Sequence, residues 1–161
     1  MKLANLLTPD RIILEMVAGE HWPAIVELID HLVDGSSLAR ELREEILVSL
    51  RQREEQVSTG VGHGVAIPHA FSEKLEQVVA VFGRSKGGID FEALDGKPVH
   101  SVILFLVPKK DYHLHLQTLA AIAKLFTNAE IRRRLGAAGS HQEILDIFTG
   151  KSSKPAPNGV A

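Results

Sequence analysis

Residues 99–107, VHSVILFLV, form an almost continuous run of apolar, largely β-branched side chains. A half-exposed strand would show polar residues at every second position, so this run predicts a strand that is buried on both faces. Such burial requires helices on both sides of the sheet. The segment therefore predicts a central strand inside a layered α/β fold.

Helical patterns precede the strands. Apolar side chains recur at helical spacing over residues 21–34, and a second series predicts a helix that ends near residue 53. Asp34-Gly35 ends the first helix, and Ser36 or Ser37 is expected to cap the second. Residues 11–14 predict a short strand before both helices.

Helical patterns return after Pro108, where a helix is expected to begin near Asp111. Its apolar stripe consists of Tyr112, Leu116, Leu119, Ala123 and Phe126. Two capping boxes are expected to open further helices: Thr127 with Glu130, and Ser140 with Glu143.

The middle of the chain is rich in β-branched residues and turn signals. Residues 64–67 and 78–82 predict strands beside the central one, and turns are expected at Gly87-Gly88 and Asp95-Gly96. Helices, then strands, then helices indicate an α/β fold: one three-layer α/β/α domain with a mixed sheet of about four to five strands. We expect this domain over residues 1–150 and a disordered tail over residues 151–161.

Composition excludes several classes of function. The formal net charge of −2 gives no reason to expect nucleic acid as a partner, and no basic run suggests a membrane anchor. The chain has no cysteine, no signal-peptide pattern, and no apolar run near the about 20 residues that a spanning helix needs. We therefore expect a cytoplasmic protein that does not insert into the membrane.

Residues 58–71, STGVGHGVAIPHAF, carry three glycines within five positions and one proline, so they cannot form a regular helix. The natural interpretation is a short strand that runs into a loop at Pro68-His69. A stiff loop at a strand end is a common platform for a reactive side chain. The alternative is that the glycines only build turns and His69 is a plain exposed loop residue, and local chemistry by itself favours that alternative.

Two further residues are candidates for a site that would hold an anion. His115 falls in the first turn of the helix expected near Asp111, where free backbone N–H groups favour negative charge. Arg53, at the end of the second helix, offers a fixed positive charge. His113 lies about 200° around the helix from His115 and should not share its site. The simpler alternatives are a structural hydrogen bond for His115 and an exposed surface position for Arg53.

A metal site is the main competitor. His63 with His69, or His113 with His115, could in principle bind zinc, but the sequence lacks the i, i+4 spacing and acidic partner of a motif such as HExxH. The sequence also lacks a GxSxG elbow and a GxxxxGK[ST] loop. We expect neither a metal nor a cofactor.

Longer motifs carry more information than spacing does. Arg53-Glu54 is followed by residues 58–69, STGVGHGVAIPH, and two more segments agree: residues 89–99, IDFEALDGKPV, and residues 115–123, HLQTLAAIA. Over about residues 3–149 the chain resembles the fructose/mannitol-type IIA domains of the bacterial phosphoenolpyruvate-dependent sugar phosphotransferase system. That family includes a nitrogen-related regulatory branch.

The resemblance implies a role for each matching residue. His69 corresponds to the histidine that accepts phosphate from the phosphocarrier HPr as tele-phosphohistidine, His115 to the histidine that orients or stabilises the transferring group, and Arg53 to the arginine near the phosphate. The residues that would support the loop are Thr59, Gly60, Gly62, His63, Gly64 and Pro68. At His63 the family more often has Asn.

The resemblance leaves the destination of the phosphate open. The chain would pass it to a IIB domain in sugar transport, or it would bind target proteins according to its phosphorylation state. Two features favour the regulatory role. One is the Arg-Glu-x-x-x-Ser-Thr motif before the glycine-rich run, and the other is that no IIB or membrane segment is attached to this chain. An apolar docking rim of Val61, Ala70 and Phe71 is expected around His69. A metal- or ligand-binding regulatory module without phosphotransfer is the alternative from another class.

Overall fold

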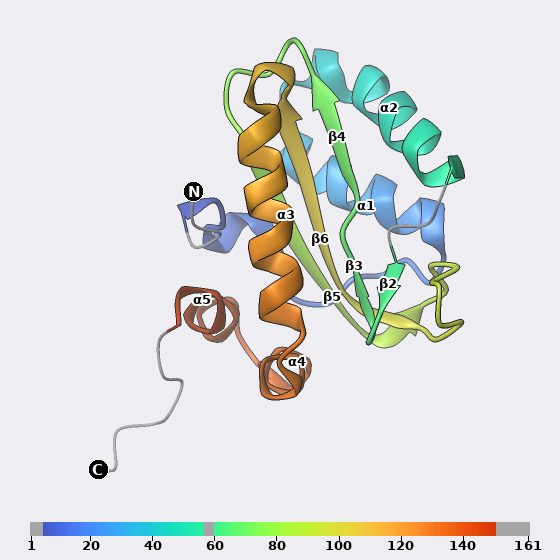
Figure 1. Cartoon of the computed structure of the whole chain (residues 1–161), viewed down its shortest axis with the longest axis vertical. Coiled ribbons are helices and arrows are strands. Elements are labelled where there is room, and N and C mark those ends of the chain that lie inside the picture. Colours follow the sequence, from blue (N-terminus) through green and yellow to red (C-terminus); the bar gives the residue numbers. More distant parts are fainter. Residues whose placement is uncertain (1–4, 57–59, 151–161) are drawn as a thin grey trace.

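The computed structural model describes residues 5–56 and 60–150, apart from the side chains of Val61 and Tyr112. The expected tail over residues 151–161 and Thr59 lie outside the described residues. The helices are α1 (His21–Asp34), α2 (Arg43–Gln56), α3 (Tyr112–Phe126), α4 (Ala129–Ala137) and α5 (His141–Thr149). The strands are β1 (Ile12–Ile13), β2 (Gly60–Gly62), β3 (Val65–Ala66), β4 (His69–Ser72), β5 (Val79–Ile89) and β6 (Val99–Pro108) (Figure 1).

The strands form one mixed sheet in the order β1-β5-β6-β3-β2, and β4 also pairs with β6. β5 and β6 are antiparallel, whereas β3 and β4 run parallel to β6. β3 and β4 occupy successive positions on the same side of β6, because Val65 pairs with Ser101 and His69 pairs with Phe105. The six strands thus fill five positions across the sheet, and the mixed α/β class is confirmed.

Helices cover both faces of this sheet (Figure 1). Successive residues of β6 belong to two separate hydrophobic clusters: Val102, Leu104 and Leu106 pack with α1 and α2, and Ile103, Phe105 and Val107 pack with α3, α4 and α5. All six are at most 2% exposed. The prediction of a central strand buried on both faces is confirmed.

The helix α1 covers the residues expected from the sequence, but the start of the second helix was predicted wrongly. Ser36 has a φ of 62°, in the left-handed region, and the residue at the N-cap of the next helical turn is Ala39, so neither Ser36 nor Ser37 caps a helix. A 3₁₀ turn at Arg40–Leu42 comes next, and α2 begins at Arg43. Left-handed backbone at Ser36 lets the chain leave α1 sharply, which delays the next helix.

The caps of the last two helices were predicted with one error. The Ser140 hydroxyl accepts from the backbone N–H of Glu143, which confirms the start of α5. At α4 the cap is Asn128 rather than Thr127: its side chain accepts from the N–H groups of Glu130 and Ile131. An amide oxygen caps as well as a hydroxyl does, so two neighbouring capping residues could not be separated by pattern alone.

The buried face of α3 also differs from the expected stripe. The buried positions are His115, Thr118, Ile122 and Phe126, whereas Leu116 is 47% exposed and Ala123 is exposed. Apolar residues occur around most of this helix, so periodicity does not fix which side faces the sheet. Among the described residues, no helix is long and apolar enough to cross a membrane.

The turn expected at Gly87-Gly88 lies inside β5, where the pairing with β6 shifts register between Arg84 and Ile89. Gly88 has a φ of 87°, and a Cβ there would lie 2.9 Å from the Pro98 side chain. The two glycines therefore form an irregularity within a long strand. The turn at Asp95-Gly96 is confirmed by the hydrogen bond from Gly96 N to Ala93 O.

Candidate functional site

His69 is the first residue of β4, not a loop residue as the sequence suggested. Pro68 separates β3 from β4, and its carbonyl still accepts from Phe105 N at 2.9 Å, so the chain rejoins β6 at once. The residue is only 8% exposed. Local glycines suggested a loop, but pairing with the buried strand β6 extends the strand to the histidine itself.

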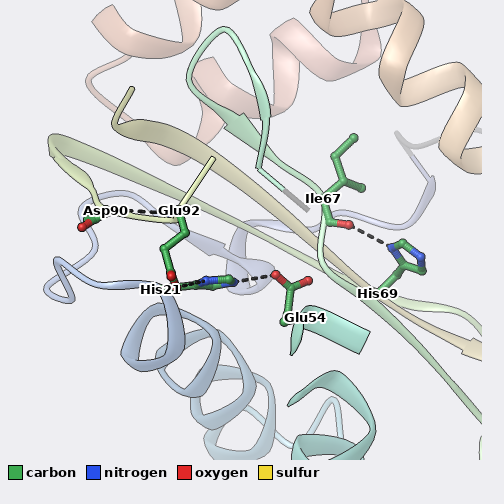
Figure 2. A network of polar contacts seen from close by, with 6 residues as sticks. All are labelled: His21, Glu54, Ile67, His69, Asp90 and Glu92. Carbon is green, nitrogen blue, oxygen red and sulfur yellow. Dashed lines mark hydrogen bonds and ion pairs between the residues drawn. The ribbon is translucent and has the colours of Figure 1, made fainter. Parts of the chain in front are cut away.

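One hydrogen bond fixes the tautomer of the His69 ring. Nδ1 lies 2.9 Å from the carbonyl oxygen of Ile67 (Figure 2). A carbonyl oxygen can only accept, so Nδ1 carries the hydrogen in the neutral ring and Nε2 keeps a free lone pair. The ring therefore presents Nε2 as its nucleophilic atom.

Arg53 lies at this nucleophilic atom. It belongs to the last turn of α2, and its Nε donates to Nε2 of His69 at 3.3 Å. The hydrogen bond agrees with the tautomer, because Nε2 must be unprotonated to accept it. The alternative of an exposed Arg53 on the surface is thereby excluded.

His115 approaches His69 from α3, on the other side of the sheet. The two ring centroids are 4.8 Å apart with an interplanar angle of 45°. The ring of Phe71 packs edge-on against His115 at 4.5 Å, and His115 is 5% exposed. His113 is exposed, as its position around the helix predicts. The structure thus brings together the three residues that the resemblance singles out: His69, His115 and Arg53.

Both histidines are held neutral at physiological pH. Burial lowers the pKa of His69; the Arg53 guanidinium lowers it further, while the hydrogen bond to Ile67 and the Glu54 carboxylate oppose the shift. Burial, together with repulsion from His69 in its protonated form and from Arg53, lowers the pKa of His115 to about 4. The site therefore contains one permanent positive charge and two neutral imidazoles.

The glycine-rich run forms a tight left-handed segment in front of β3. Gly62, His63 and Gly64 have φ values of 101°, 58° and 76°, and His63 N donates to Asp95 Oδ2. Asn tolerates this left-handed region well, which agrees with the expectation from the resemblance that Asn is the commoner residue at the position of His63. Gly60 lies in β2, where its carbonyl accepts from Leu94 N.

An open groove leads to the site between α2 and β4. Its lining includes His69 and Arg53, together with Val48, Phe71 and Lys109. His69 is thus reached from the groove even though little of its surface is exposed.

The apolar rim of the site differs from the one expected. Ala70 is 4% exposed and belongs to the core, Phe71 is half-buried against His115, and the side chain of Val61 is not described. Val48 on α2 lines the groove and is 54% exposed, and Leu116, the neighbour of His115 in α3, is 47% exposed. Leu116 was missed because it was assigned to the buried stripe of its helix.

Two other parts of the site were not assigned a role from the sequence. The acceptor for Nδ1 is the backbone of Ile67, which no side-chain pattern reveals. Glu54, next to Arg53 in the Arg-Glu pair, is buried and close enough to influence the pKa of His69. The position of Glu54 in the Arg-Glu pair was the sequence signal that could have indicated its role.

The arrangement is suited to an anionic group. Within residues 5–56 and 60–150, no group of three or more His, Asp and Glu side chains could hold a metal. A nucleophilic nitrogen beside a guanidinium can accept an electrophilic group that brings negative charge with it.

Comparisons with known proteins agree with this geometry. Residues 5–151 match the family model for the phosphoenolpyruvate-dependent sugar phosphotransferase system, EIIA 2. The chain is 36% identical over 149 residues to the fructose-specific EIIABC component of Bacillus subtilis, covering 92% of this chain and 23% of the length of that relative. It is 34% identical over 148 residues to the nitrogen regulatory protein of Bradyrhizobium diazoefficiens, covering 92% of this chain and 95% of that one.

The crystal structure of nitrogen regulatory protein IIA-Ntr from Neisseria meningitidis superposes with a TM-score of 0.83 at 32% identity, and covers 91% of this chain and 98% of that one. The family match spans the whole described chain from residue 5 onward. The chain therefore belongs to the EIIA 2 family of the phosphoenolpyruvate-dependent sugar phosphotransferase system.

Proposed function

We propose that this chain is a phosphocarrier that accepts a phosphoryl group on Nε2 of His69 from an HPr-type protein. The observation that carries the proposal is the unprotonated Nε2, which lies 3.3 Å from Nε of Arg53 while Nδ1 donates to Ile67. A neutral imidazole with its lone pair fixed in position is a good nucleophile near pH 7.

The transfer step moves a phosphoryl group from the imidazole of the donor protein to the imidazole of His69. The lone pair of Nε2 attacks phosphorus while the N–P bond of the donor phosphohistidine breaks, and the donor nitrogen keeps that electron pair. The hydrogen on Nδ1 of His69 stays on the ring, so the product is tele-phosphohistidine. Phosphoryl transfer depends mainly on positioning and on stabilisation of charge, which Arg53 and His115 would supply.

The charge of the site favours this product. A phosphoryl group carries up to about two negative charges at neutral pH. The guanidinium of Arg53 would neutralise part of that charge. His115 is neutral before transfer, and a phosphoryl group on the neighbouring ring would favour its protonation, so that it becomes a second cation where it is needed.

Protein partners would dock along the groove between α2 and β4. Val48 supplies exposed apolar surface in the groove beside His69, and Leu116 is exposed next to His115 in α3. Apolar contacts at the centre of an interface contribute most to affinity. We propose that this surface receives HPr and then a second protein in turn, in the cytoplasm.

The second protein is proposed to be a regulated target rather than a IIB domain. The solved IIA-Ntr structure combines a TM-score of 0.83 with 32% identity, and a nitrogen regulatory protein is matched over 95% of its length. The fructose-specific relative supports the other destination, because its name includes A, B and C components. Both destinations require the same phosphorylated His69.

Labelling tests the central step. The protein is incubated with labelled phosphoenolpyruvate, enzyme I and HPr, and the label is tested for acid lability and base stability. We expect stable incorporation in the wild type, loss of label in His69→Ala, and retention in the matched controls His63→Ala and His113→Ala. Label that survives His69→Ala would refute the assignment, and a wild type that takes no label would favour a ligand-binding module.

A second experiment separates the two destinations. The phosphorylated chain is offered a purified fructose-type IIB domain, and the loss of label from His69 is followed over time. We expect slow or no transfer. Rapid and complete transfer to the IIB cysteine would contradict the regulatory destination and leave the phosphocarrier role intact.

A further inference from the structure

His21, the first residue of α1, lies between two carboxylates. Its Nε2 is 2.5 Å from Glu54 Oε1 and its Nδ1 is 3.1 Å from Glu92 Oε1 (Figure 2). Carboxylates can only accept, so both ring nitrogens donate and the ring is an imidazolium. Burial lowers the pKa of His21, but the hydrogen bonds and charges of Glu54 and Glu92 outweigh it and raise the pKa above its usual value.

The ring of His21 also rests on the segment that contains the motif IDFEALDG. The ring of Phe91, which is fully buried, lies 4.1 Å from the ring of His21 between centroids. The segment is tied to the start of α1 by the hydrogen bond from Asp90 N to Gly19 O. Glu92 is positioned in turn, because its N–H donates to Asp90 Oδ1 (Figure 2). His21 therefore joins this motif to the last turns of α2.

Glu54 is the reason that this connection reaches the phosphoryl site. Its side chain is 5% exposed, and it is the neighbour of Arg53 in the chain. Its carboxylate acts on the pKa of His69, so it lies within electrostatic reach of that ring. A buried carboxylate without a cation would repel an incoming phosphoryl group and attract the guanidinium of Arg53.

The other side chains beside His21 make contacts of their own. Trp22, Arg51 and Glu55 line the same shallow hollow. Arg51 lies over the Trp22 ring at 5.0 Å and pairs with Glu55 on the surface.

We propose that His21 is a positioning residue of the phosphoryl site. Its imidazolium neutralises and holds the carboxylate of Glu54, so that Arg53 stays directed at Nε2 of His69. The motif at residues 89–92 then acts as the support that keeps His21 in place. The proposal rests on the proposed phosphocarrier function for its rate effect, but its electrostatic effect on His69 is independent of transfer.

The test compares His21→Gln with His21→Lys, which restores the positive charge. The matched control is His31→Gln, on the same helix, where Nε2 lies 2.7 Å from the backbone carbonyl oxygen of Asp10. The measurements are the single-turnover rate of phosphoryl transfer from HPr, the pKa of the His69 ring by NMR, and the melting temperature.

We expect His21→Gln to slow transfer about tenfold, because small displacements of a positioning group have large effects on rate. We also expect the pKa of His69 to rise, since the Glu54 charge is no longer balanced. His21→Lys should restore both values, and His31→Gln should leave both unchanged. A folded His21→Gln with a normal rate and a normal His69 pKa would overturn the proposal.

A double variant keeps the test decisive if loss of His21 alone impairs folding. In His21→Gln/Glu54→Gln the carboxylate that His21 balances is removed as well, so transfer should be faster than in His21→Gln. A double variant no faster than the single one would overturn the proposal. If wild-type protein takes no label, the phosphocarrier role fails, while the NMR values for His69 still decide whether His21 balances Glu54.

Discussion

The Nδ1 atom of His69 donates to the carbonyl oxygen of Ile67, only two residues earlier in the chain. This short connection selects Nε2 as the free nitrogen and directs it toward α2. Because the acceptor is a backbone atom next to Pro68, whose φ is fixed, the ring orientation is set before any partner binds. The reactivity of the site therefore depends on local backbone geometry as much as on charged side chains.

Replacement of Arg53 should affect rate more than stability. We expect Arg53→Ala to slow transfer onto His69 by about a hundredfold, the loss associated with removal of one strong charge-stabilising group. Arg53→Lys should recover part of this rate, because an ammonium supplies charge without the planar geometry of a guanidinium. Arg40→Lys, at an exposed position, is the control and should match the wild type. Equal rates for Arg53→Ala and wild type would contradict the assigned role.

The depressed pKa of His115 should make stability depend on pH. The folded chain keeps this ring neutral down to about pH 4, whereas the unfolded chain protonates it near its usual value of 6.5. Its stabilising contribution is therefore complete above about pH 6.5 and is lost as the pH falls toward 4. His21 acts in the opposite sense, because its raised pKa favours the folded state below pH 6.5.

Urea denaturation at pH 7 and pH 5 isolates the contribution of His115. We expect the fall in the free energy of unfolding between these pH values to be smaller in His115→Asn than in the wild type. His113→Asn, which changes an exposed histidine, should behave as the wild type does. An unchanged pH dependence in His115→Asn would show that the ring is not kept neutral by folding.

Relief of the left-handed backbone at His63 should stabilise the protein. With a φ of 58°, this residue carries a conformational cost that glycine avoids. We expect His63→Gly to raise the free energy of unfolding by about 1 kcal/mol, because a Cβ is unfavourable in this region. His63→Ala keeps the Cβ and should give no gain, so an equal gain in both variants would point to another cause. Chemical denaturation measures the difference.

Charged substitutions on the exposed apolar rim should weaken docking without unfolding the chain. We expect Val48→Asp and Leu116→Asp each to raise the KM for HPr about tenfold, which corresponds to about 1.4 kcal/mol of lost interface energy. Val17→Asp is the control, since Val17 is 91% exposed and lies in the loop before α1. A normal KM in both rim variants would place the docking surface elsewhere.

Much of the fold follows from residue patterns because those patterns reflect burial. Residues 99–107 could only be a strand covered on both faces, and the spacing over residues 21–34 gave α1 with its observed limits. The buried face of α3 could not be predicted in the same way, because apolar residues surround the helix and the sheet decides which of them are covered. Ser36 failed as a cap because its backbone is left-handed, which no side-chain pattern encodes.

The functional site also combines features that the sequence predicts with features that it does not. Local chemistry did not distinguish His69 from an ordinary loop histidine, and its assignment came from the resemblance carried by long motifs. The neighbours that decide its chemistry are far apart in sequence: Arg53 precedes it by 16 residues, and His115 lies on the opposite layer. Ile67 contributes only a backbone carbonyl. Spacing along one element cannot reveal contacts that form when three layers pack together.

The division of β6 between two hydrophobic clusters has a consequence for the whole domain. Arg53 belongs to α2, which packs in one cluster, and His115 belongs to α3, which packs in the other. His69 lies on β4, between these two helices. A small shift of either helical layer over the sheet would separate Arg53, His69 and His115. Such a shift needs less disruption than unfolding of the chain does. Core substitutions far from His69 should therefore lower the rate of phosphoryl transfer. This rate should respond to a loss of packing more sensitively than the melting temperature does.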